Sequence, residues 1–337
     1  MLTQILANYG LFLAKTLTVV GAVGLLVIGA LRARRSGGAD DGERLEILDL
    51  NERYKSLARA LKESSLPKKA LRAWQKAERR REKALAKAQP EEVRARLFVI
   101  DFNGDLRATE VAALRVLVTA ILLDSRAGDA VLVRIENAGG TVHEHGLAAS
   151  QLARLRARGI PLTVAVDKVA ASGGYLMACV AERIVAAPFA IIGSIGVLAE
   201  IPNFHRLLER HGVDFELHTA GEHKRTLTLF GENTDAAREK LKDQLNDVHT
   251  LFKSFVAEYR PSLDLTRVAT GEYWHGQRAV ELGLVDELQT SDDLLLAASE
   301  ERDLIQLKYS VRKKPLERLL ASLQSARIGH WMSLFAR

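Results

Sequence analysis

The pattern of apolar and polar positions divides the chain into four regions. The first, Tyr9 to Leu31, is almost continuously apolar, and at about 1.5 Å rise per residue a helix of this length crosses a hydrocarbon core of about 30 Å. The pattern predicts a single transmembrane helix, within a membrane anchor over residues 1–35. A cleaved signal peptide is the alternative, but the first eight residues carry no Lys or Arg and no small-residue cleavage site is evident.

The second region, residues 36–94, is predicted to be a basic helical arm. Its sequence from about residue 42 to 96 is dense in Ala, Lys, Arg, Glu and Leu, and Pro67 divides it into two helices. The second helix carries Lys69, Arg72, Lys76, Arg79, Arg80, Arg81, Lys83 and Lys87. Attraction to anionic lipid headgroups and a simple solvated face both remain open. Nucleic-acid binding is disfavoured, because Trp74 is the only aromatic residue of this helix.

The third region, residues 95–297, alternates short apolar strands with amphipathic helices. This alternation predicts an α/β domain with a largely parallel sheet. The predicted strands are Leu97 to Phe102, Ala130 to Glu136, Leu162 to Val166, Arg183 to Ala187 and Asp214 to Thr219. The predicted helices are Glu110 to Leu123, Val142 to Arg158, Ser172 to Ala181, Asn203 to His211, Asp235 to Tyr259 and Gln277 to Gly283. The fourth region, residues 298–337, is predicted to be a basic C-terminal tail that touches a membrane or a neighbouring subunit, or simply frays.

Composition narrows the chemistry only slightly. The 337 residues are 27% charged and 47% hydrophobic, as in ordinary globular proteins, and the net charge of +6 names no partner by itself. Cys179 is the only cysteine, which excludes an intramolecular disulfide and a cysteine-based metal cluster. Arg32, Arg34 and Arg35 follow the apolar span and weakly favour a cytoplasmic C-terminal side.

Two glycine-rich turns follow predicted strands. In the first, ENAGGTV, Gly139 and Gly140 could turn backbone N–H groups into a cleft as an oxyanion hole, although a GG pair alone is more often only a turn. In the second, VAASGGYLMA, Ser172 begins a predicted helix. Its simple role is to cap that helix, but the small residues around it leave room for a substrate, and Gly173 N–H is a second oxyanion donor.

A serine nucleophile needs a base. His143, His145, His205, His211, His218 and His223 are candidates, but none stands in a recognisable motif with an aspartate partner. The alternative is a lysine kept neutral by burial. Lys224, in TAGEHKRTLT after the strand DFELHT, is such a candidate, and its ordinary role would be a solvated loop residue.

Five segments occur in a characteristic order: ENAGGTVHEHG, TVAVDKVAASGGYLMACVAERIVA, IIGSIGV, GEHKRTLT and HGQRAVELGLVDEL. In these segments the chain resembles the signal peptide peptidase (SppA/SohB) family, most closely its SohB branch. The resemblance implies a ClpP/crotonase-like fold and a Ser-Lys dyad of Ser172 and Lys224, which are 224 − 172 = 52 positions apart. It also implies that Ser194, in IIGSIGV, holds the lysine amine, and that Ala138 replaces a usual proline.

The resemblance further implies a membrane-anchored serine endopeptidase of the bacterial inner membrane, with one span and neither metal nor organic cofactor. Expected partners are extended membrane-proximal peptides, such as signal-peptide remnants or misfolded segments, together with membrane lipid and copies of the chain in a homo-oligomeric ring. No nucleic acid is expected. Two alternatives stay open: an acyl-CoA enzyme of the crotonase type, which would share the fold and the oxyanion turns, and a non-proteolytic membrane scaffold.

Overall fold

The computed structural model describes residues 43–87, 94–221 and 223–311, with eight further positions among residues 13–24. Residues 46–309 form one compact unit, and residues 1–45 with 310–337 form another. Most of the predicted span Tyr9 to Leu31 lies outside the described residues, as does the tail from residue 312. Among the helical residues that are described, no helix has the length and apolar character needed to cross a membrane.

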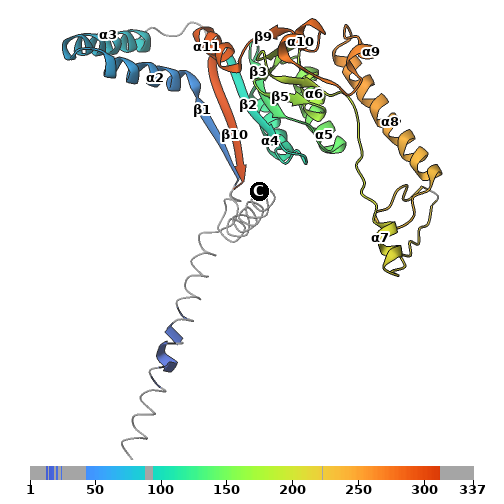
Figure 1. Cartoon of the computed structure of the whole chain (residues 1–337). Helices are drawn as coiled ribbons and strands as arrows, with labels where there is room; N and C mark the ends of the chain where they lie inside the picture. Colours follow the sequence, from blue (N-terminus) through green and yellow to red (C-terminus); the bar gives the residue numbers. More distant parts are fainter. Residues whose placement is uncertain are drawn as a thin grey trace, which may run out of the picture. The chain divides into compact units, whose positions relative to one another are not determined.

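A mixed α/β fold with a mainly parallel sheet is confirmed (Figure 1). Parallel pairing joins neighbouring strands in the order β10-β2-β3-β4-β6-β9, and β1 lies beyond β10. The bounds of these strands are β1 (Glu43–Asp49), β2 (Arg96–Gly104), β3 (Ala130–Asn137), β4 (Leu162–Val166), β6 (Arg183–Ala186), β9 (Glu287–Leu288) and β10 (Asp303–Val311). A short branch leaves β3 through β5 (Val169–Ala171) and β7 (Ile191–Gly193) to the antiparallel β8 (Tyr273–His275).

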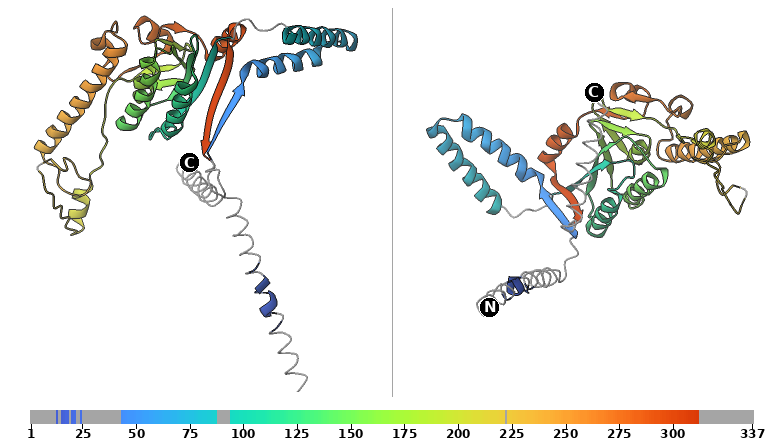
Figure 2. Two further views of the ribbon diagram at one scale, coloured as in Figure 1. Left: turned by 180° about the vertical axis from the view of Figure 1, so that it is seen from behind. Right: turned by 60° about the horizontal axis from the view of Figure 1, so that its bottom comes forward.

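Both faces of the sheet are buried, because alternate residues of each strand point to opposite sides. Phe98 and Ile100 of β2 pack into the larger core with α4 (Val111–Asp124), α5 (Val142–Ala157) and α6 (Gly173–Ala178). Leu97 and Val99 belong to a smaller core with Leu50 and with Leu295 of α11 (Ser291–Glu301). The C-terminal end of β3 and the β5–α6 turn therefore rest on this packed core. Figure 2 shows the sheet and its helices from two further directions.

After β7 the chain leaves the sheet. Residues 195–234, here called the excursion, contain one short helix, α7 (His205–Arg210), and no strand among their described positions. The long helix α8 (Asp235–Tyr259) then returns to the sheet, where α9 (Leu265–Val268) and α10 (Gly276–Glu281) follow (Figure 1).

Three sequence predictions need correction. Residues 43–49 form strand β1 rather than helix, since Leu45 and Ile47 alternate with polar residues in ERLEILD. The arm's two helices are α2 (Leu50–Ser65) and α3 (Lys68–Lys87), divided at Pro67 as predicted. Residues 214–219 form no strand, because Phe215 packs on Phe230 within the excursion, with ring centroids 5.7 Å apart. Finally, β10 continues the sheet beyond residue 297, where a tail was expected.

Candidate active site

The first glycine-rich turn links the end of β3 to the start of α5. Gly139 has a φ of 96°, which residues with side chains rarely adopt. A Cβ atom on Gly140 would lie 2.1 Å from the carbonyl oxygen of Leu106. That oxygen also accepts the N–H of Thr141 at 2.9 Å. The close approach of the Leu106 backbone therefore requires glycine at position 140.

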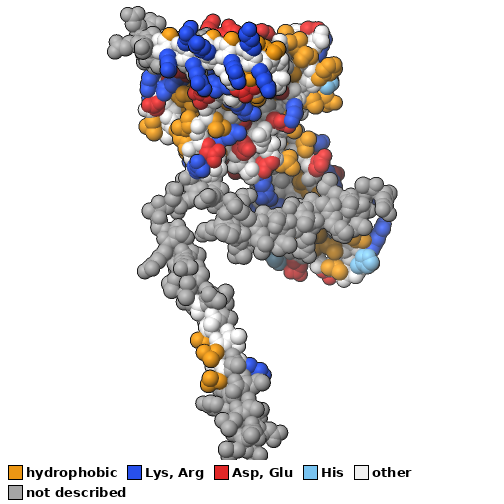
Figure 3. Space-filling model, turned by 90° about the vertical axis from the view of Figure 1, so that its left-hand side faces the viewer, with side chains coloured by type: hydrophobic (Ala, Val, Ile, Leu, Met, Phe, Trp, Pro, Cys, Tyr) orange, Lys and Arg blue, Asp and Glu red, His pale blue; other side chains and the backbone are white. Residues whose placement is uncertain are grey.

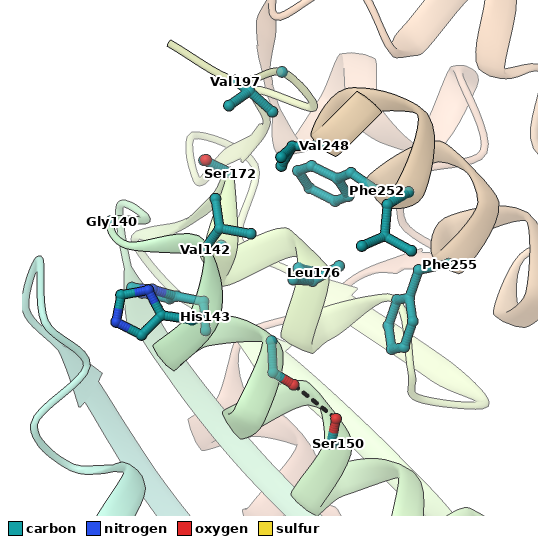
Figure 4. A pocket seen from close by; sticks show the side chains of 15 residues that line it. Gly140, Val142, His143, Ser150, Ser172, Leu176, Val197, Val248, Phe252 and Phe255 are labelled. Carbon is teal, nitrogen blue, oxygen red and sulfur yellow. Dashed lines mark hydrogen bonds between the residues drawn. The ribbon is translucent and has the colours of Figure 1, made fainter. Parts of the chain in front are cut away.

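Ser172 lies at the turn between β5 and α6, with φ 52° and ψ −118°. Such a conformation costs about 1–3 kcal/mol. Two hydrogen bonds hold it, because its N–H donates to Gly193 O at 2.7 Å and its carbonyl accepts from Leu176 N–H at 3.0 Å. The side chain makes no capping bond to α6, so the interpretation of Ser172 as a helix cap is wrong. Figure 4 shows Ser172 between the turn at Gly140 and Val197.

Two backbone N–H groups near Ser172, those of Gly140 and Gly173, have no acceptor among the described residues. The N–H of Gly139, by contrast, donates to Asn137 Oδ1 at 2.6 Å. Gly139 instead provides space, since a Cβ atom there would lie 2.6 Å from Ser172 Cβ. Of the three glycines singled out from the sequence, Gly140 and Gly173 thus keep an unbonded donor near the serine.

A buried pair, Asn137 and His145, supports the two turns that carry these N–H donors. His145 Nδ1 lies 2.9 Å from Thr141 O and its Nε2 lies 3.2 Å from Asn137 Oδ1. A Cβ atom on Gly173 would come within 2.4 Å of the His145 ring. Both ring nitrogens face oxygen atoms and the residue is fully buried, so His145 supports the turn and is not placed to act as a base. Sequence reasoning grouped it with the other histidines and missed this position.

A pocket of about 320 Å³ opens beside Ser172. Its wall is mainly apolar, and the apolar side chains are Val142, Leu176, Val197, Val248, Leu251, Phe252 and Phe255 (Figure 4). None of the fifteen lining residues is Lys, Arg, Asp or Glu. Four of these side chains come from α8, at i, i+3, i+4 and i+7 from Val248, a spacing that identifies one helix face but that the sequence interpretation did not connect with the serine.

Ser194 follows β7 and has a φ of 51°, close to that of Ser172. Strands β5 and β7 pair in parallel with Ala171 opposite Gly193, so the two serines leave neighbouring strand ends together. Ser194 N–H donates to Glu272 O at 2.7 Å. The structure therefore brings Ser172, Ser194 and the glycines into one region.

Lys224 lies elsewhere in the chain. It is exposed, its N–H donates to Gly221 O at 3.1 Å, and it is not among the residues that line the Ser172 pocket. Its neighbours His223 and Arg225 line a second hollow with Lys240 near the start of α8. Lys240 and Val248 are eight residues apart, or about 12 Å along a helix axis. Within one chain, the Lys224 segment thus contacts the opposite part of α8 from the serine pocket.

A serine on a strained strand-to-helix turn, two free N–H groups and an adjoining apolar pocket are the features of a hydrolase with a serine nucleophile. Sequence profiles agree with this class. Residues 4–152 match "Peptidase family S49 N-terminal" and residues 154–305 match "Peptidase family S49". The chain belongs to peptidase family S49.

Individual relatives indicate which members of the family the chain is similar to. "Probable protease SohB" of Haemophilus influenzae is 47% identical over 328 residues, which cover 94% of this chain and 93% of that protein. "Putative signal peptide peptidase SppA" of Enterococcus faecium is 27% identical over 216 residues, covering 63% and 62%. A solved structure of a 1510-N membrane-bound stomatin-specific protease variant with a substrate peptide has a TM-score of 0.43 at 12% identity, covering 69% of this chain and 100% of that one. The predicted resemblance to the SppA/SohB family is confirmed, and with it a general protease function.

Proposed function

We propose that this protein is a membrane-anchored serine endopeptidase of the bacterial inner membrane, with Ser172 as its nucleophile. The observation that carries the proposal is the position of Ser172 at the mouth of an apolar pocket. Its backbone is strained and its side chain makes no capping bond to α6. Preorganised donors stabilise the charge that develops on a carbonyl oxygen during attack, typically by about 3–4 kcal/mol for each donor. Gly140 N–H and Gly173 N–H are the donors in this proposal.

Lys224 is the proposed general base, and it comes from a neighbouring copy of the chain. Support comes from the pocket, whose lining includes no lysine, and from the exposure of Lys224 on the excursion. The excursion also exposes apolar side chains that a neighbouring copy would cover, with exposed fractions of 78% for Leu198, 52% for Leu207 and 50% for Val213. A closed homo-oligomeric ring would give every serine one such lysine.

The reaction is an acyl transfer to water. The Lys224 amine, acting in its neutral form, takes the proton of Ser172 as the serine oxygen bonds to the peptide carbonyl carbon. The C–N bond then breaks, and the lysine returns the proton to the leaving amine. A water molecule, deprotonated by the same lysine, releases the acyl group and restores the serine. Ser194 would orient the lysine by a hydrogen bond.

The pocket indicates which peptides would bind. Its apolar wall suits an apolar side chain next to the bond that is cut, while the rest of an extended peptide would add as a strand beside the sheet. Signal-peptide remnants and misfolded membrane segments have such side chains. An anchor over residues 1–35, a basic arm over residues 36–94 and a ClpP/crotonase-like domain complete the proposed organisation, without metal or organic cofactor.

A fluorophosphonate probe tests the nucleophile directly. The purified full chain should be labelled at Ser172 and should cleave a casein-like substrate, whereas Ser172→Ala should do neither. Lys224→Ala should lose cleavage and label slowly, and Ser194→Ala should fall between the two. Labelling at another serine, or cleavage by Ser172→Ala at the wild-type rate, would exclude this function. An acyl-CoA enzyme or a scaffold would show no labelling at Ser172.

A further inference from the structure

Helix α3 carries its positive charge on one face. At about 100° per residue, the basic positions 68, 69, 72, 76, 79, 80, 83 and 87 fall within an arc of about 120°, and Arg81 alone falls opposite. Glu78 and Glu82 fall outside that arc. The basic side chains whose exposure is described, from Lys68 to Lys83, are all exposed. The face therefore presents cations without interspersed carboxylates.

The other face of α3 is held by α2. The ammonium of Lys62 in α2 lies 4.9 Å from the centre of the Trp74 ring, within the range of a cation–π contact. Arg59 and Glu63 of α2 line a hollow together with Trp74, Gln75 and Glu78 of α3, and Arg79 at the edge of the basic arc also borders it. Because α2 takes this side, the basic arc of α3 faces away from the hairpin. Figure 3 shows Lys and Arg side chains gathered on the surface formed by these helices.

The cations of this face have no carboxylate partner in the part of the chain that the structure describes. None of Arg72, Lys76, Arg79, Arg80 and Lys83 forms an ion pair with a described residue. Cations on the sheet body commonly have a carboxylate partner, such as Arg96 with Asp129 at 2.6 Å, Lys168 with Glu136 at 3.0 Å and Arg260 with Asp286 at 2.6 Å.

Repulsion makes the arrangement costly for the isolated helix. The pairs 68/72, 72/76, 76/80, 79/83 and 83/87 place like charges four residues apart, and each such pair destabilises a helix by a few tenths of a kcal/mol, about 0.2–0.5. A partner that supplies several negative charges at once would relieve all of them. Five of the cations already converge, since Arg72, Lys76, Arg79, Arg80 and Lys83 line a hollow of about 310 Å³.

We infer that the basic face of α3 docks on the anionic phospholipid headgroups of the membrane that anchors the chain. The inference rests on the proposed membrane anchor, whose apolar span Tyr9 to Leu31 is separated from the start of β1 by only residues 32–42. Juxtamembrane basic residues are attracted to an anionic surface, and the attraction of several residues adds. The exposed arc contains no aromatic residue on which bases could stack, which favours lipid over single-stranded nucleic acid. Docking would hold the peptidase domain close to the membrane, where its substrates emerge.

The test uses the full chain in nanodiscs of phosphatidylcholine alone, or with about one third phosphatidylglycerol. Hydrogen–deuterium exchange of residues 68–87 should be at least about five-fold slower in the anionic discs. The difference should vanish at about 0.5 M salt, where the screening length falls to about 4 Å. Peptides from α8 should exchange equally in both discs.

Matched variants separate a docking face from general charge. The triple variant Arg72→Glu, Lys76→Glu, Lys83→Glu should abolish the protection. The control triple variant Arg115→Glu, Arg126→Glu, Arg158→Glu has the same charge change at exposed positions of the sheet body and should keep it. Equal exchange in both discs, equal loss in both variants, or protection by soluble RNA or inorganic phosphate but not by lipid would each overturn the inference. Failure of the wild-type chain to enter discs at all would instead count against the anchor.

Discussion

The region that carries Ser172 and the region that carries Lys224 are built in opposite ways. Around Ser172, Gly173, Ala170 and Asn137 are almost fully buried, and two backbone hydrogen bonds hold a strained backbone. The excursion around Lys224 has one helix, the six-residue α7, among its described residues and exposes many of its apolar side chains. Packing within one chain thus sets the backbone geometry of Ser172 but brings Lys224 to no part of the serine pocket. This difference supports the proposal that a neighbouring copy completes the site.

The largest expected effect is a loss of activity, which for Lys224 should come with almost no loss of stability. Ser172→Ala and Lys224→Ala should each lower kcat/KM by about 10⁴-fold or more, as for residues that act as one catalytic unit. Lys224→Ala should change the free energy of unfolding by less than about 0.5 kcal/mol, because its side chain is exposed. Steady-state peptide cleavage and urea unfolding measure the two quantities.

His143→Ala provides the control for the base. The His143 side chain lines the serine pocket but is 80% exposed, so its removal should change kcat/KM by no more than about three-fold, within the small effects of exposed positions. A loss comparable to that of Lys224→Ala would move the base to the serine's own chain and break the comparison.

The body of the domain was largely predictable from sequence, and the excursion was not. The bounds of β4 and α8 were predicted to the residue, because a short apolar run predicts a strand buried on both faces and a 3.6-residue period predicts a helix with one buried face. The apolar pattern of residues 214–219 also predicts a strand, but in the structure Phe215 packs on Phe230 instead. Local pattern cannot distinguish these outcomes, since Phe215 and Leu217 stay exposed in the structure although their spacing suits a strand.

The candidate site likewise has residues that could be predicted from the sequence and residues that could not. The glycines and Ser172 could be found because tight backbone approaches require glycine locally, whereas the Asn137–His145 support and the four α8 residues of the pocket meet the serine only through tertiary packing. A helix-periodic stripe on α8 was visible in the sequence, but nothing there connected it with position 172.

The next effect compares two neighbours on α8. Phe252 is 8% exposed and lines the pocket, so Phe252→Ala should cost about 3 kcal/mol in stability and raise KM for peptides with large apolar side chains. Leu251 lines the same pocket at 66% exposure, so Leu251→Ala should cost less than about 1 kcal/mol. Urea unfolding and a series of peptide substrates check both. Equal losses in the two variants would show that burial does not rank the pocket wall.

Low pH should lower the free energy of unfolding of the α/β domain. Burial alone would raise the pKa of the Asp129 carboxyl, but hydrogen bonds from the Arg96 guanidinium and from the Arg126 and Arg96 N–H groups outweigh it and lower the pKa. A lowered folded-state pKa gives stability that is present above the unfolded value of about 3.9 and is lost as the pH falls through the folded value. The free energy of unfolding should therefore drop by about 1 kcal/mol more in wild type than in Asp129→Asn between pH 6 and pH 3. Parallel pH profiles would contradict this.

The smallest effect has the opposite sign. Ser172→Gly should stabilise the chain by about 1 kcal/mol, because glycine adopts a φ of 52° without strain, although activity is lost. Lys224→Gly in the excursion should give no such gain. Calorimetric Tm values measured side by side check the pair, and destabilisation by Ser172→Gly would show that the serine backbone is not strained.

Mixing two inactive variants tests the central claim most directly. Ser172→Ala and Lys224→Ala proteins, dissociated together and reassembled, should recover peptidase activity, because a serine from one variant then meets a lysine from the other. With equal amounts and random assembly, recovery should approach about a quarter of the wild-type activity per chain, since half of the chains keep Ser172 and half of their neighbours keep Lys224. Complete absence of recovery, in mixed assemblies shown to contain both chains, would contradict a site shared between copies.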